Sequence, residues 1–306
     1  LSMIRALNKH LGIPAEVLIQ EPGGTIPDDV EGLEWNRFPV TEMARKGFLK
    51  ATKNIKEHAE RAMRELMARA GGLQVAAPLC RKNDGTRRNA KMDSYALAGW
   101  CMHVLAQAGD NKPKKAYRKG SITHAFLREV AKLSSFEDGP LRAQQYLASH
   151  GIVLVIGPHL ANTYLDGAAM LLEDGTPVIG MTLRYDRLDN FWFCLLHELT
   201  HVARHLGDGG DRMFVDDLDL RAKDNDPREK EADEWAEEAL IPAKDWNEHP
   251  AQDAPHVSNV IALAQRVGVH PAIVAGRIRW RHGNYHILSQ LVRTGEVRKH
   301  FDVQWK

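Results

Sequence analysis

The sequence predicts an α+β fold that is mainly helical, with a small β-sheet next to a helix carrying the motif H-E-x-x-H. Two short, β-branched apolar runs predict strands, "GIVLVIGP" at 151–158 and "TPVIGMTLR" at 176–184. Long segments on both sides of these runs carry apolar residues at helical spacing. The stretch "FWFCLLHELTHVARH" at 191–205 begins as the apolar face of a buried helix and continues into histidines and a glutamate.

The region before the first strand is predicted to be helical. Residues 41–70 are predicted to form one helix, because Thr41 can cap its start, apolar residues recur on one side, and Gly71 and Gly72 follow its end. Three further helices are predicted at 95–108, 123–133 and 140–150.

The second strand is predicted to form a hairpin with the residues before it. Leu171 and Leu172 precede the turn residues Asp174 and Gly175, and the run at 176–184 follows at once. The helix with the H-E-x-x-H motif comes next, so the small sheet and this helix belong to one α+β unit.

The bulk composition is that of a globular protein. The 306 residues are 43% hydrophobic and carry a formal net charge of +1, which gives no global attraction for nucleic acid or for a membrane. The three cysteines are far apart and odd in number, which favours a reducing compartment. Neither a long apolar run nor a secretion signal is evident, so we expect a cytoplasmic protein without a membrane partner.

The first residues predict two short helices around a glycine. In "MIRALNKHLGIPAEVLIQ" the apolar spacing stops at Gly12, and Pro14 suits the first turn of a second helix. This pattern fits either a helix-turn-helix or two ordinary packed helices. Residues 21–29 are rich in Pro, Gly and Asp and are predicted to be a linker.

The H-E-x-x-H motif predicts a metal site. His197 and His201 are four residues apart, so a helix brings them to one face, where two neutral imidazoles can hold one Zn²⁺. Glu198 lies about 100° further round the helix and can reach a water on the metal as a general base. A catalytic zinc site of this type needs a third protein ligand and one open position.

The third ligand is expected on the acid-rich segment "DPREKEADEWAEEALIP" at 226–242, which is predicted to be a helix. Glu229 and Asp233 share a face, so Glu229 can bind the metal while Asp233 accepts a hydrogen bond from a ligand histidine. Spacing leaves Glu231 open as the alternative ligand. His205, four residues after His201, is a further alternative, although three histidines along one helix rarely converge on one ion.

Together, "HELTH" and "EKEADEWAEEALIP" resemble the ImmA/IrrE family of bacterial metallopeptidases. The resemblance covers about 140–285 and implies a gluzincin-like minimal metalloprotease core. It also selects Glu229 over Glu231 as the third ligand, with zinc as the cofactor. The segment before the linker resembles the closing helices of a Xre-type helix-turn-helix, as in HigA-like antitoxins fused to such a domain.

The expected organisation has four parts. A helix-turn-helix remnant is expected at 1–25, a helical spacer or partner-binding region at 26–139, the ImmA/IrrE-like metallopeptidase domain at 140–285, and a C-terminal extension at 286–306. We expect DNA binding only in a form in which a complete helix-turn-helix precedes Leu1.

The expected function is that of a zinc endopeptidase. Zinc would be held by His197, His201 and Glu229, and Glu198 would take a proton from the attacking water. Tyr185, His286 and Arg277 are candidates for the oxyanion stabiliser that the sequence does not separate, and we take Tyr185 as the first candidate. By resemblance, the substrate is a specific regulatory protein, such as a repressor or a toxin–antitoxin partner.

Two other functions fit the same residues. A HigA-like antitoxin or transcriptional regulator could use the metallopeptidase-like domain to sense or bind a partner. A closed structural metal site would need a fourth ligand such as His205 and would leave Glu198 without a function.

Overall fold

The computed structural model describes residues 33–72, 92–207, 212–216, 226–303 and 305, and the segment predicted as a helix-turn-helix lies outside these residues. The α+β prediction is confirmed. A four-stranded mixed sheet has the order β1-β3-β2-β4, with β1 parallel to β3 and the other pairs antiparallel. The strands are β1 (Val153–Ile156), β2 (Gly167–Leu171), β3 (Pro177–Met181) and β4 (Met213–Asp216).

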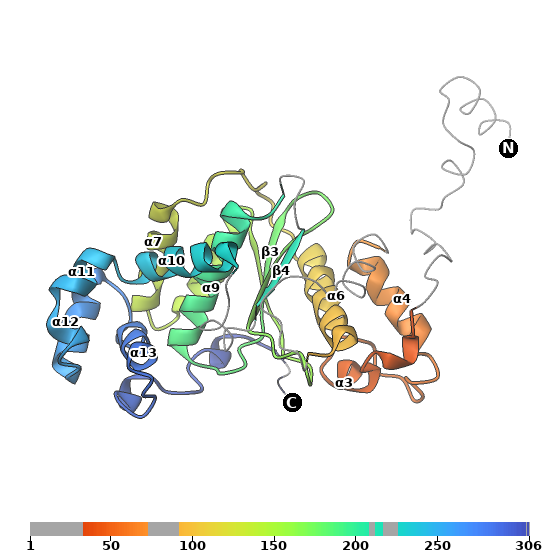
Figure 1. Cartoon of the computed structure of the whole chain (residues 1–306). Coiled ribbons are helices and arrows are strands. Elements are labelled where there is room, and N and C mark those ends of the chain that lie inside the picture. Colours follow the sequence, from red (N-terminus) through yellow and green to blue (C-terminus); the bar gives the residue numbers. More distant parts are fainter. Residues whose placement is uncertain (1–32, 73–91, 208–211, 217–225, 304, 306) are drawn as a thin grey trace, which may run out of the picture.

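Both faces of the sheet are buried, and each belongs to its own hydrophobic core. In β1, Leu154 and Ile156 point into one core, while Val153 and Val155 point into the other. This alternation follows from the two-residue period of a strand. Figure 1 shows helices on both sides of the sheet.

One face packs against the helix that carries H-E-x-x-H, α9 (Leu188–Arg204), and α10 (Pro227–Leu240) packs along α9. The remaining helices on this side are α7 (His124–Lys132), α8 (Gly139–Ala148), α11 (Ala243–Glu248), α12 (Val257–Val267) and α13 (Pro271–His282), with the short 3-10 helices η2 (Leu133–Ser135), η4 (Pro250–Gln252), η5 (Ser289–Leu291) and η6 (Arg298–His300).

The other face is covered by α6 (Ser94–Asp110), backed by η1 (Trp35–Arg37), α3 (Val40–Arg45) and α4 (Ala59–Arg69). The contact with α6 is close at Gly180 of β3, where an added Cβ would lie 2.7 Å from the Trp100 ring. Helices from the predicted spacer region therefore complete one of the two cores. The predicted domain boundaries at 25, 139 and 285 stay predictions.

The prediction of a single helix over 41–70 is wrong, because the chain leaves the helix after α3. Gly47 has a φ of 76°, its N–H donates to the carbonyl of Ala44, and the N–H of Phe48 donates to that of Met43. This pair of hydrogen bonds is the Schellman motif, which ends helices at a left-handed glycine. It turns Phe48 into the core, where it is 2% exposed, and the second helix begins only at Ala59.

The other helices predicted before the first strand are confirmed as α6, α7 and α8. Thr123 caps α7 by accepting a hydrogen bond from the N–H of Phe126 at 3.2 Å. The hairpin of β2 and β3 is also confirmed, with Gly175 of its turn at a φ of 82°. Strand β4 was not predicted.

A segment near the C-terminal end of the described chain, which includes Val297 and Arg298, is hydrogen-bonded to the loop before α9. Asp186 Oδ1 accepts hydrogen bonds from the N–H groups of Val297 at 3.0 Å and Arg298 at 2.8 Å. The guanidinium of Arg298 in turn donates to the carbonyl of Leu183. This loop leads directly into the helix that carries the predicted metal site.

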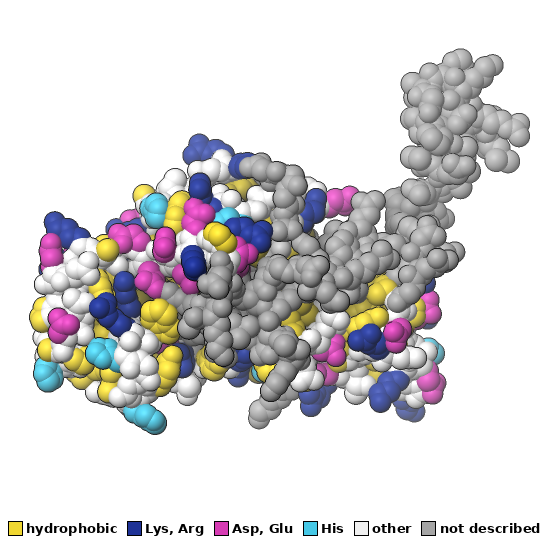
Figure 2. Space-filling view, in the orientation of Figure 1, with side chains coloured by type: hydrophobic (Ala, Val, Ile, Leu, Met, Phe, Trp, Pro, Cys, Tyr) yellow, Lys and Arg dark blue, Asp and Glu magenta, His cyan; other side chains and the backbone are white. Residues whose placement is uncertain are grey.

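In the described part of the chain, no single helix combines the length and the apolar character needed to cross a bilayer. The pair α12 and α13 meets the length and composition test only when taken together, and it is bent by 120°. On the face drawn in Figure 2, acidic and basic side chains are interspersed over the described part, in keeping with the small net charge.

Candidate metal centre

The site is built where α9 and α10 pack together. Apolar side chains such as Phe191, Trp192 and Leu195 anchor α9 in the core and are at most 1% exposed. Helix α10 starts at Pro227, and Asp226 caps it by accepting a hydrogen bond from the N–H of Arg228 at 2.9 Å. The cap fixes the first turn of α10, which carries Glu229.

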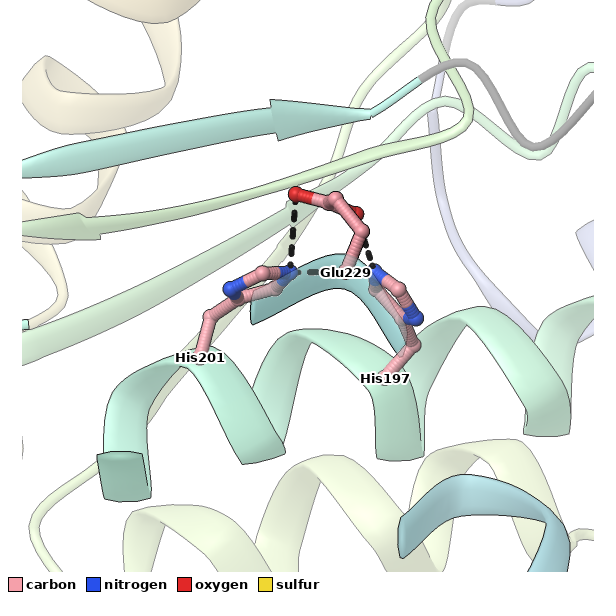
Figure 3. A group of neighbouring side chains, drawn as sticks. All are labelled: His197, His201 and Glu229. Atoms are coloured by element: carbon pink, nitrogen blue, oxygen red, sulfur yellow. Dashed lines mark hydrogen bonds and ion pairs between the residues drawn. The ribbon is translucent and has the colours of Figure 1, made fainter. Parts of the chain in front are cut away.

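The side chains of His197, His201 and Glu229 converge on one point (Figure 3). The two Nε2 atoms are 3.0 Å apart, and the Glu229 oxygens lie 3.2 Å from the Nε2 of His197 and 3.5 Å from that of His201. All three side chains are 0% exposed. The structure thus brings the three predicted ligands together, and we refer to them as the three-residue group.

Asp233 is hydrogen-bonded to the ring nitrogen of His197 that faces away from the three-residue group. Its Oδ1 lies 3.0 Å from the Nδ1 of His197. A carboxylate can only accept here, so Nδ1 carries the proton and donates it. In a neutral ring this leaves the Nε2 of His197 with its lone pair, directed at the three-residue group.

A chain of hydrogen bonds also links the outer ring nitrogen of His201 to two further side chains. The Nδ1 of His201 is 2.9 Å from the Nδ1 of His205, and the Nε2 of His205 is 3.0 Å from Oε2 of Glu231. Glu231 accepts from His205, so the remaining ring nitrogen of a neutral His205 accepts from His201. His205 and Glu231, the alternative ligands of the sequence analysis, thus lie behind His201 rather than in the three-residue group.

Burial and neighbouring side chains shift the pKa values of Glu229 and His205. Burial alone would raise the pKa of Glu229, but hydrogen bonds and charge from His197 and His201 outweigh burial and hold that pKa far below its usual range. Burial lowers the pKa of His205, although Glu231 opposes the effect, and this favours a neutral ring. Glu229 is therefore ionised at neutral pH and could serve as a ligand.

The donor set fits a divalent cation. Two Nε2 lone pairs and a carboxylate that face one another in a dry site repel unless a cation or shared protons lie between them. Two nitrogens and one carboxylate oxygen are also the set that catalytic zinc sites use, with a further position left for water. The group could hold Zn²⁺.

Glu198 lies on the side of α9 that faces the sheet. It is 0% exposed, and a Cβ added at Gly167 of β2 would lie within 3.0 Å of both Glu198 Oε1 and Cys194 Sγ. Glycine at the start of β2 therefore lets α9 approach the sheet closely enough to enclose this carboxylate. Gly167 could not be predicted from the sequence, because a lone glycine in a strand carries no specific signal.

A comparison with protein families agrees with the motifs of the sequence. Residues 149–279 match the family model of the IrrE N-terminal-like domain, Peptidase_M78. The matched segment contains all four strands and runs from the end of α8 into α13. No curated protein matches the chain. The match supports the resemblance found for about 140–285 and points to a metallopeptidase domain.

The structure separates one of the three candidate oxyanion residues from the other two. Tyr185 and Arg277 line a cavity that is also bounded by Phe193, one helical turn before His197. His286 lies in an exposed segment after α13. Tyr185 and Arg277 share one cavity, so the choice of Tyr185 stays a prediction.

The IrrE-like domain also uses aromatic residues that were not predicted. The Phe214 ring of β4 stacks on the His201 ring, with centroids 4.5 Å apart and an interplanar angle of 16°. This contact covers one face of the His201 ring and so limits its rotation. It could not be found from the sequence, because β4 is a short strand without a clear periodic signal.

Proposed function

We propose that this chain is a zinc-dependent endopeptidase that cleaves a specific regulatory protein. The convergence of His197, His201 and Glu229 in a buried site carries the proposal, and the match to Peptidase_M78 supports it. Bound zinc would supply a Lewis acid that polarises the scissile carbonyl and lowers the pKa of water toward about 7.

The chain's own residues have separate tasks in this proposal. Glu198 accepts a proton from the attacking water on its carboxylate and passes it to the leaving amine. Asp233 holds His197 in the tautomer that keeps Nε2 free of a proton. Tyr185 is the proposed donor to the oxyanion that forms on the substrate carbonyl.

Metal content is the first test. Elemental analysis of the purified chain should give about one zinc per wild-type molecule, and Glu229→Ala should lose it. Glu234→Ala is the matched control, because Glu234 is exposed on the same helix. A wild-type chain that takes up no zinc after reconstitution would remove the basis of the peptidase proposal.

Cleavage is the second test. New protein N-termini are mapped in source cells that express either the wild-type chain or Glu198→Gln. The proposal expects one or a few cleavage sites, in a regulatory protein, that appear only with the wild type, while Glu198→Gln keeps its zinc. Identical sets of N-termini in the two cultures would instead favour a regulator that uses the domain for binding.

A further inference from the structure

The contact between α9 and α10 extends beyond the three-residue group. The two helices run side by side, so partners recur every four residues, which is about 6 Å along the helix axis. His201 meets Glu229, and His197 meets Asp233. One turn further, Phe193 and Glu237 line a cavity of about 410 Å³. This volume is within the range of about 300–1,000 Å³ that is typical of ligand sites.

The cavity, which we call the α9–α10 pocket, is adjacent to the candidate metal centre. The Phe193 ring belongs to its lining, and its centroid is 6.1 Å from that of the His197 ring. A peptide whose scissile bond lies at the three-residue group would therefore present a neighbouring side chain to this pocket.

The lining combines apolar side chains with charged side chains that are paired. Among its lining residues, Leu240, Ile241 and Ile273 are buried, whereas Trp280 and Tyr285 are 46% and 53% exposed. Aromatic residues that remain exposed at the mouth of a cavity are typical of binding sites.

The four charged residues of the lining form two pairs. Arg187 Nε donates to Asp189 Oδ1 at 3.0 Å, and Arg277 Nη2 donates to Glu237 Oε2 at 3.4 Å. Two cations and two anions leave the lining neutral, so a charged side chain would gain little there to offset the loss of its hydration.

One wall of the pocket is fixed by hydrogen bonds to residues that do not line it. Tyr185 and Arg187 flank Asp186, which accepts the hydrogen bonds from Val297 and Arg298. The pocket therefore exists before a ligand arrives, which lowers the entropic cost of binding.

We propose that the α9–α10 pocket selects substrates that place an aromatic or other bulky apolar side chain next to the scissile bond. The inference rests on the proposed peptidase function and adds a substrate class to it. The position of Phe193 next to His197, a neutral lining and two exposed aromatic lining residues carry it.

The test measures binding without turnover, in the full chain carrying Glu198→Gln. N-acetyl-phenylalaninamide, N-acetyl-alaninamide and N-acetyl-lysinamide are titrated and followed by NMR line broadening. The expected result is at least a tenfold preference for the phenylalanine probe. Asn190→Trp, which adds bulk to the lining, should abolish this preference, and Trp280→Ala should weaken phenylalanine binding about threefold or more.

Phe136→Ala is the matched control, because Phe136 is 48% exposed and does not line the pocket. It should leave all three affinities unchanged. Equal binding of the three probes, a preference for lysine, or a phenylalanine preference that survives both pocket variants would overturn the inference. None of these readouts depends on cleavage, so they can fail while zinc content and cleavage hold, or hold while those fail.

Discussion

The Nδ1 atoms of His201 and His205 lie 2.9 Å apart, and the Nε2 of His205 lies 3.0 Å from Oε2 of Glu231, so the three side chains form one hydrogen-bonded chain. Removing the far end of this chain should weaken metal binding without touching a ligand. Glu231→Gln turns an anionic acceptor into a neutral one, and we expect zinc affinity to fall about 10-fold to 100-fold. Competition with a chromophoric chelator measures the change.

Two further variants separate this effect from a loss of folding. Glu234→Gln removes a charge from the exposed face of the same helix and should leave zinc affinity unchanged. Glu231→Asp keeps the charge and should recover part of the affinity that Glu231→Gln loses. If Glu231→Gln bound zinc as tightly as the wild type, the chain behind His201 would have no part in metal binding.

Arg128 joins the ends of two helices, and its loss should destabilise the domain. Its Nη1 donates to the carbonyls of Ala239 at 2.8 Å and Leu240 at 3.1 Å, and Nη2 donates to Val267 at the end of α12. A hydrogen bond to a charged group contributes about 1.5–3 kcal/mol. Arg128→Met should therefore lower the free energy of unfolding by roughly 2–4 kcal/mol in urea denaturation.

The control for Arg128 is Arg142→Met. The Arg142 side chain is 47% exposed and pairs with Asp138 one helical turn away. Exposed pairs of this kind contribute about 0–1 kcal/mol. Equal losses for the two variants would show that the three carbonyl contacts of Arg128 add no stability.

The helix with H-E-x-x-H and the segment with Glu229 could be predicted because their signals are local. Spacing along one helix determines which side chains share a face, and Pro227 marks where the second helix begins. The chain behind His201 could not be found in this way. It depends on the rotation of α10 about its own axis relative to α9, and both Glu229 and Glu231 satisfy the spacing.

Two errors in the fold also have physical causes. Gly47 lies inside an otherwise helical pattern, and such a glycine is compatible with a continuous helix or with a left-handed end. The structure has the left-handed helix end at Gly47, because it lets Phe48 pack into the core. Strand β4 is only four residues long, and its place at the sheet edge depends on pairing with β2, far away in the sequence.

His103 should make stability depend on pH. It stacks on Phe48 with ring centroids 3.7 Å apart, and burial, with a contribution from Arg69, lowers its pKa to about 4. In the unfolded chain the pKa is about 6.5. The unfolded state thus binds more protons between these values, so stability falls as pH drops from about 6.5 to about 4 and levels off below.

Urea denaturation at pH 7 and pH 5 checks this prediction. The loss between the two pH values should be on the order of 1–2 kcal/mol smaller in His103→Gln than in the wild type. His282→Gln changes an exposed histidine and should keep the wild-type difference. A His103→Gln variant with an unchanged pH dependence would mean that His103 is protonated equally well in the folded state.

Gly167 should affect the proposed general base while leaving the metal ligands in place. An alanine Cβ there would come within 3.0 Å of Glu198 Oε1 and Cys194 Sγ, so the carboxylate or the strand has to move. The three atoms nearest to this Cβ position belong to Glu198 and Cys194 and not to His197, His201 or Glu229, so we expect zinc content to stay at the wild-type level. Cleavage of the substrate identified by N-terminal mapping should fall about 100-fold or more, since a general base contributes about 10²–10⁴ to the rate.

Gly109→Ala is the control for Gly167→Ala, because its added Cβ meets only the carbonyl of Arg69 at an ordinary 3.7 Å. Wild-type cleavage by Gly167→Ala would show that the position of Glu198 does not depend on the close approach of α9 to β2. Loss of zinc together with activity would show that the glycine supports the metal centre as a whole.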